Sequence, residues 1–176
     1  EDIYISDINM TDIPAEAILF DMYYNGKEAA EALKNPAMEK LPVTEETSTF
    51  RKIYIQNIAC LGAKHAIYVQ GLPEMNVQEV HIENSIFHTK HGFTCVEGDG
   101  IWLKNVVMET GTADPAMRII NSRNLSLENV QISGKAEKGL QIDGKQSSAI
   151  RLRNSNAETL GIQFGEGVNQ RILTKQ

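Results

Sequence analysis

The segment "IWLKNV", residues 101–106, alternates apolar and variable side chains and then reaches an asparagine. Five other segments have the same order, with Asn or Asp in the fifth place: "IYISDI" (3–8), "IYIQNI" (53–58), "VHIENS" (80–85), "LSLENV" (125–130) and "IRLRNS" (150–155). Such alternation is typical of half-buried β-strands. The repeat therefore predicts a series of six similar strands.

A second strand-like segment follows each of the first ones. These segments are "AILFD" (17–21), "AIYVQG" (66–71), "GFTCVEG" (92–98), "AMRIIN" (116–121), "GLQIDG" (139–144) and "GIQFGEG" (161–167). Two short strands in a repeat of two dozen residues indicate a solenoid, and we interpret the chain as an all-β parallel β-helix of about six coils. Leucine-rich repeats have a similar period, but their asparagine comes one place later and they lack the second strand.

The asparagines should lie above one another at one corner of successive coils. They are Asn57, Asn84, Asn105, Asn129 and Asn154. A side-chain amide both donates and accepts hydrogen bonds, so stacked amides can pair from coil to coil. Asp7 holds the first position but lacks the donor, so we expect the column to begin at Asn57.

Residues 24–50 interrupt the repeat between its first and second coils. The segment opens with a turn, contains an Ala-rich stretch that predicts a short helix at about 28–34, and is then broken by Pro36 and Pro42. A long insertion in one coil of a solenoid often borders a functional face. It can equally be a loop that covers an exposed apolar surface.

Composition excludes few functions. The net charge of -6 argues against a nucleic-acid partner, and no apolar run is long enough for a membrane span. Cys60 and Cys95 fall at different points of the repeat, which favours two buried free thiols over a disulfide. A solenoid needs covered ends, whereas the strand pattern begins at residue 3. We therefore expect the chain to be the C-terminal part of one longer β-helix domain, able to self-associate through its first coil.

Motifs for chemistry are sparse. No Asp-Asp dipeptide occurs, and Glu97, Asp99 and Asp114 stand in segments that read as turns. His88 and His91 in "HTKH" lack a nearby third ligand, so we expect no metal and no other cofactor. The outward positions of the first strands hold Tyr4, Tyr54, His81 and Trp102 on successive coils. Such a column can hold sugar rings, or its rings can simply pack together.

Three segments are similar to glycoside hydrolase family 28, the polygalacturonase family: "AILFDMYYNG", "PVTEETSTFRKIYIQNI" and "AKHAIYVQGLPEMNVQEVHIENS". The resemblance looks closest to bacterial members of the Bacteroidetes type and is strongest over residues 1–110. It implies a right-handed parallel β-helix and inverting hydrolysis of α-1,4-galacturonide linkages in pectin. The implied partner is a pectic polysaccharide or oligogalacturonide, and the implied location is secreted or periplasmic.

The resemblance assigns this chain one part of the family's active site. "DMYYNG" is similar to the family's tyrosine segment, which implies that Tyr23 contacts the sugar, with Tyr24 as the alternative if the alignment shifts by one residue. His91-Gly92 and Arg118-Ile119 mimic the family's histidine and arginine motifs but lack the aspartates that should precede them. We expect no catalytic residue in this chain and place the catalytic aspartates upstream.

The substrate's carboxylates would require local cations near the cleft. Lys27, Arg51, Lys52 and Lys64 are the candidates, although each also reads as an ordinary surface charge. The alternative function is a non-catalytic β-helix used for carbohydrate binding or adhesion.

Overall fold

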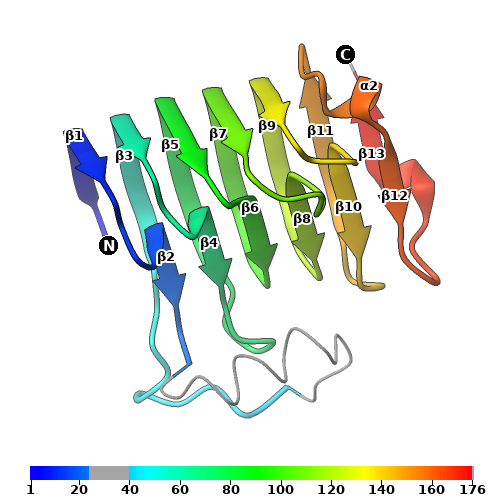
Figure 1. Ribbon diagram of the computed structural model, residues 1–176. Helices are drawn as coiled ribbons and strands as arrows, with labels where there is room; N and C mark the ends of the chain where they lie inside the picture. Colours follow the sequence, from blue (N-terminus) through cyan, green and yellow to red (C-terminus); the bar gives the residue numbers. More distant parts are fainter. Residues whose placement is uncertain (24–39, 176) are drawn as a thin grey trace.

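The computed structural model describes residues 1–23 and 40–175, which form an all-β parallel solenoid of about five turns (Figure 1). Sheet A contains β1 (Ile3–Thr11), β3 (Arg51–Leu61), β5 (Val77–Thr89), β7 (Gly98–Thr110), β9 (Arg123–Gly134), β11 (Ser148–Arg153) and β13 (Leu173–Lys175). Sheet B contains β2 (Glu16–Asp21), β4 (His65–Gln70), β6 (His91–Val96), β8 (Met117–Ile120), β10 (Leu140–Asp143) and β12 (Ile162–Phe164).

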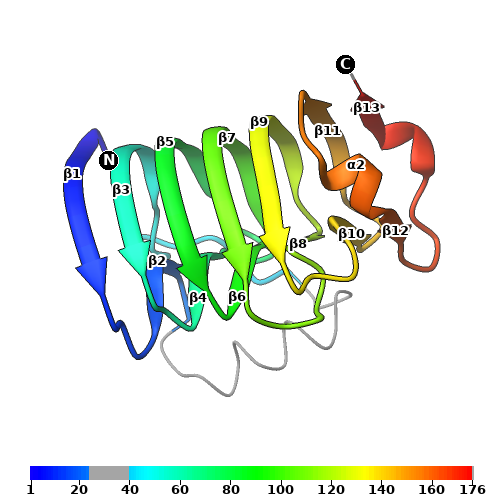
Figure 2. The same cartoon turned by 45° about the horizontal axis from the view of Figure 1, so that its top comes forward.

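The predicted alternation between two sets of strands is confirmed. Odd-numbered strands lie side by side in sheet A and even-numbered ones in sheet B up to β12, as the rotated view in Figure 2 shows. Helix is confined, among the described residues, to α2 (Ala157–Leu160) and the 3₁₀ turn η1 (Gln170–Ile172). A leucine-rich repeat is excluded because each repeat contributes to both sheets.

The core between the sheets consists of apolar columns. In sheet A, Ile55, Ile82, Leu103, Leu127 and Leu152 lie in register on successive strands, and all are buried. Sheet B contributes similar apolar columns, one of which contains Phe93 and the residues paired with it on β4 and β8. Each coil buries its apolar face on the next coil as well as across the solenoid, so stability depends on register.

The strands of sheet A bend at the asparagines. Asn57, Asn84, Asn105, Asn129 and Asn154 all have positive φ, between 49° and 57°. Asparagine tolerates this left-handed conformation better than most residues. Four of the strands continue beyond this asparagine, with lengths of up to 13 residues, whereas β11 ends at Arg153, just before Asn154.

The expected amide column is present, with one correction. Asn105 donates to Asn84, Asn129 to Asn105 and Asn154 to Asn129, at 2.6–2.8 Å. The continuous column begins at Asn84 and not at Asn57, because among the described residues no hydrogen bond joins Asn84 to Asn57. Asn57 Nδ2 instead donates to Asp7 Oδ1 at 3.0 Å, so these two residues form a separate pair. Hydrogen bonds from Ser6 and Asn57 lower the pKa of Asp7.

Other expectations have mixed outcomes. Cys60 and Cys95 are buried free thiols, as predicted. The helix expected at 28–34 lies outside the described residues, whereas 41–50 forms loop with a turn near Thr44 and Thr47. No described helix has the length and apolar character needed to traverse a lipid bilayer.

Candidate functional site

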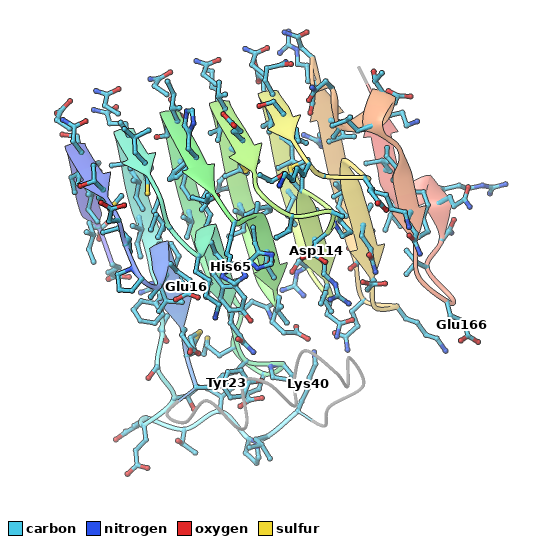
Figure 3. All side chains as sticks on the ribbon, in the orientation of Figure 1. Glu16, Tyr23, Lys40, His65, Asp114 and Glu166 are labelled. Carbon is cyan, nitrogen blue, oxygen red and sulfur yellow. The ribbon has the colours of Figure 1, made fainter. Side chains whose placement is uncertain are left out.

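The outer face of sheet B carries a row of polar side chains at the beginning of its strands. We call Glu16, His65, His91 and Asp114 the histidine row. Glu16 is in register with His65, which is in register with His91, and Asp114 lies in the loop before β8. Figure 3 shows Glu16, His65 and Asp114 following one another along the solenoid.

Contacts join all four members of the histidine row. His65 Nδ1 lies 3.2 Å from Glu16 Oε1, and His91 Nδ1 lies 3.1 Å from Asp114 Oδ2. The two imidazoles are stacked, with ring centroids 4.6 Å apart. The arrangement is therefore carboxylate, imidazole, imidazole, carboxylate, across four coils.

The carboxylates orient the imidazoles. Glu16 accepts a hydrogen bond from His65 Nδ1–H, which leaves Nε2 of the neutral ring as an acceptor. Beside Asp114, His91 Nδ1 also lies 3.4 Å from Thr112 Oγ1. Burial, followed by the neighbouring His91 ring, lowers the pKa of His65, although Glu16 opposes the effect. His65 is therefore neutral near pH 7 and can accept a hydrogen bond from a ligand hydroxyl.

A second row lies further along the same strands. Tyr68, Thr94, Arg118 and Gln141 are in register, and all four are partly exposed. Arg118 Nε donates to Asp143 Oδ2 at 3.2 Å, and Gln141 donates to the same oxygen at 2.8 Å. Burial, with the carboxylates of Asp21 and Glu16, raises the pKa of Tyr68 to about 12. This second row thus adds a phenol and the guanidinium group of Arg118 to the acceptors of the histidine row.

Tyr23 lies just beyond β2, away from the histidine row. Its backbone N–H donates to Asp21 Oδ1 at 2.9 Å, and the preceding Met22 N–H donates to Gln70 O. The side chain is half-buried and its hydroxyl oxygen is shielded from solvent. In Figure 3 Tyr23 lies below the ends of the sheet B strands. Its contact with sugar stays a prediction, and Tyr24 lies outside the described residues.

The expected cations are dispersed. Lys64 Nζ lies 3.9 Å from Glu16 Oε1, beside the histidine row, whereas Arg51 pairs with Glu1 on sheet A. Lys52 is on β3, in sheet A, and Lys27 lies outside the described residues. Of the four predicted residues, Lys64 alone is placed by these contacts beside sheet B.

The two carboxylates of the histidine row are too far apart to act together in the hydrolysis of a glycosidic bond. Glu16 and Asp114 are three coils apart, roughly 14 Å at the spacing of parallel strands. Glycosidases need two carboxyl groups about 5–10 Å apart. No group of three or more potential metal ligands is found among the described residues. His88 contacts Glu109 on sheet A, so the two histidines of "HTKH" point to different partners. The row is suited to binding hydroxyl-rich ligands.

The aromatic column on sheet A is present. Ring centroids are 4.9 Å apart from Tyr4 to Tyr54, 4.9 Å from Tyr54 to His81 and 4.2 Å from His81 to Trp102, and all three pairs are stacked. The rings therefore pack together, the second of the two interpretations. The faces of Tyr54 and His81 are occupied by neighbouring rings.

Glu97 is a buried carboxyl group at the end of β6. It is 5% exposed and accepts a hydrogen bond from Asn76 Nδ2 at 3.1 Å. Burial raises its pKa, against the opposing effect of hydrogen bonds from Asn121 and Asn76. The turn predicted at Glu97 and Asp99 is confirmed only at Glu97, a sharp bend with φ of 50° between β6 and β7, because Asp99 lies within β7.

Glu97→Gln is expected to raise the thermal midpoint at neutral pH. Above the ordinary pKa of 4.5 the unfolded chain loses the Glu97 proton before the folded chain does, so this residue lowers stability as pH rises through its raised folded-state pKa. The midpoint difference between variant and native protein should grow from pH 4 to pH 8 in calorimetry. The exposed control Glu45→Gln should follow the native profile. A difference that does not vary with pH would contradict the expectation.

The histidine row is not apparent from the motifs in the sequence. His91 resembles part of a family motif, Asp114 stands in a turn-like segment, and neither Glu16 nor His65 belongs to a recognisable motif. A signal was available, because His65 and His91 hold the same place in successive repeats. Glu16 holds that same place on β2, whereas Asp114 had no such signal because it lies in the loop before β8, outside the strand register.

Comparison of the chain with protein families, curated proteins and solved structures gives no match.

Proposed function

We propose that this chain is the C-terminal part of a pectin-degrading glycoside hydrolase of the polygalacturonase type, glycoside hydrolase family 28. The observation that carries the proposal is the polar outer face of sheet B, where hydrogen-bonding side chains recur from coil to coil. A linear polysaccharide offers hydroxyl and carboxylate groups at regular intervals, which such a face complements. The parallel solenoid and the three similar sequence segments support the same proposal.

Within this proposal the chain binds substrate and does not cleave it. The Nε2 atoms of His65 and His91 accept hydrogen bonds from sugar hydroxyls, and Arg118 attracts a uronate carboxylate. Tyr23, from the resemblance, contacts the sugar near the scissile bond. Upstream coils supply the aspartates, of which one protonates the leaving oxygen while another activates water, with inversion. Because pectin is an extracellular polymer, we place the protein in the periplasm or outside the cell.

A non-catalytic carbohydrate-binding or adhesion module is the second candidate. It is favoured by one observation, the separation of roughly 14 Å between the two carboxylates of the histidine row. The upstream sequence distinguishes the two functions. An Asp-Asp pair on a preceding coil supports the hydrolase, and its absence supports the binding module.

The test is binding and hydrolysis of oligogalacturonate by the 176-residue chain. We expect binding by calorimetry and no release of reducing sugar above a heat-denatured control. Arg118→Gln should weaken binding about tenfold, the effect of losing one charged hydrogen bond. Arg153→Gln is the matched control, since Arg153 is an ion-paired arginine on sheet A.

Three outcomes would count against the proposal. Turnover by this chain would refute the placement of the catalytic aspartates upstream. Equal losses in the two arginine variants would refute a uronide site on sheet B. Absence of oligogalacturonate binding by protein that retains a β-sheet circular dichroism spectrum would refute substrate binding by this chain.

A further inference from the structure

The aromatic column of sheet A ends at a hollow. After Tyr4, Tyr54, His81 and Trp102, the next side chains in register are Ser126 and then Arg151. A hollow of about 420 Å³ lies here, and its lining includes Trp102, Ser126 and Arg151 together with the carboxylates of Glu79 and Asp99. Its volume falls within the range of about 300–1,000 Å³ of small-molecule sites.

The hollow is a gap of one ring in the column. His81 stacks on one face of the Trp102 indole, at a centroid distance of 4.2 Å. On the other side, the short Ser126 side chain cannot cover the indole. Arg151 lies two coils from Trp102, or about 9.6 Å at the spacing of parallel strands. One inserted ring would lie a single coil spacing from both the indole and the guanidinium group.

The walls of the gap are fixed. Arg123 Nη2 and Asn124 Nδ2 donate to the Asp99 carboxylate, both at 2.7 Å. At Gly100, where φ is +75°, a Cβ atom would lie 2.9 Å from the Trp102 ring, so the indole packs closely over this glycine. The described residues provide no ion pair for Arg151, which is exposed. The site is therefore rigid on the Trp102 side and has a free cation opposite.

We infer that this gap binds one pyranose ring of a saccharide, stacked on Trp102 and contacted by Arg151. The C–H groups on one face of a pyranose are attracted to the negative face of an aromatic ring. The hydroxyl groups of the sugar can form hydrogen bonds with Ser126 Oγ and with the side-chain oxygen of Asn124, whose Nδ2 is already bonded to Asp99. The site is on sheet A, so it is independent of the function proposed for sheet B.

The single tryptophan of the chain makes a direct test possible. Titration of the 176-residue chain with trigalacturonate, and separately with neutral galactotriose, should change Trp102 emission in a saturable way. Ser126→Tyr fills the gap with another ring of the column and should weaken this response more than about tenfold. Thr174→Tyr is the matched control, because it adds a ring in the same register beyond Arg151 and outside the gap.

Further arms assign the contacts and separate the two sites. Arg151→Gln should weaken trigalacturonate more than galactotriose if the cation meets a carboxylate, and both equally if it meets hydroxyls; either result supports the site. Arg118→Gln, on sheet B, should leave the emission response intact. An unchanged response in Ser126→Tyr, or no emission change with either saccharide in folded native protein, would overturn the inference.

Discussion

Asn129→Ala is expected to lower the free energy of unfolding by about 2–4 kcal/mol, because Asn129 holds the centre of the amide ladder. Its side chain donates to Asn105 at 2.8 Å and accepts from Asn154 at 2.6 Å. Each hydrogen bond contributes about 1 kcal/mol. Its φ of 52° costs an alanine roughly 1–2 kcal/mol more. Urea unfolding followed by circular dichroism measures the sum.

Asn129→Gly separates the two causes. Glycine removes both ladder hydrogen bonds but accepts positive φ without a steric penalty. We expect the free energy of unfolding of Asn129→Gly to exceed that of Asn129→Ala by the cost of placing alanine in the left-handed conformation. If both variants unfold within about 0.5 kcal/mol of the native protein, the range of an ordinary surface substitution, the ladder contributes nothing to the stability of the solenoid.

The ladder was predictable because its cause is local and repeated. An asparagine recurs after each pair of alternating apolar residues in the first strands. Equivalent positions of a solenoid stack on one another once the repeat length is known. The positive φ was not predicted, since an amide ladder and a backbone bend favour the same residue type. The start of the column was not predictable either: Asp7 accepts a hydrogen bond from Asn57, but the continuous ladder of amides begins only at Asn84.

The candidate site was less accessible to sequence reasoning. Glu16 and His65 are 49 residues apart along the chain, with the insertion between them. Their contact depends on the register of β2 against β4. The spacing of the repeats does not determine this register, because the insertion separates the two strands. The aromatic column was predictable because its members share one place in the repeat. The gap after Trp102 exists because the next coil has a serine, Ser126, at the position where the preceding coils have a ring. A pattern of aromatic residues alone does not reveal it.

Gly92→Ala is expected to lower the free energy of unfolding by about 2–4 kcal/mol and to disturb the histidine row. A Cβ atom at Gly92 would lie 2.1 Å from the backbone oxygen of Ala116. That oxygen accepts the hydrogen bond from Phe93 N–H at 2.9 Å, so it cannot move without separating β6 from β8. Overpacking typically costs about 1–3 kcal/mol, and loss of the hydrogen bond adds about 1 kcal/mol.

Gly111→Ala is the control for Gly92→Ala, because the nearest atoms lie 3.6 Å from its Cβ position. It should unfold within about 0.5 kcal/mol of the native protein. A stable Gly92→Ala variant would contradict the close approach of β6 to the backbone of Ala116 beside β8. The expected loss of stability would mean that Gly92 of the His91-Gly92 pair is required for close packing between coils, independently of any role of His91. Such a pair is therefore weak evidence of a catalytic histidine wherever successive coils approach as closely as these.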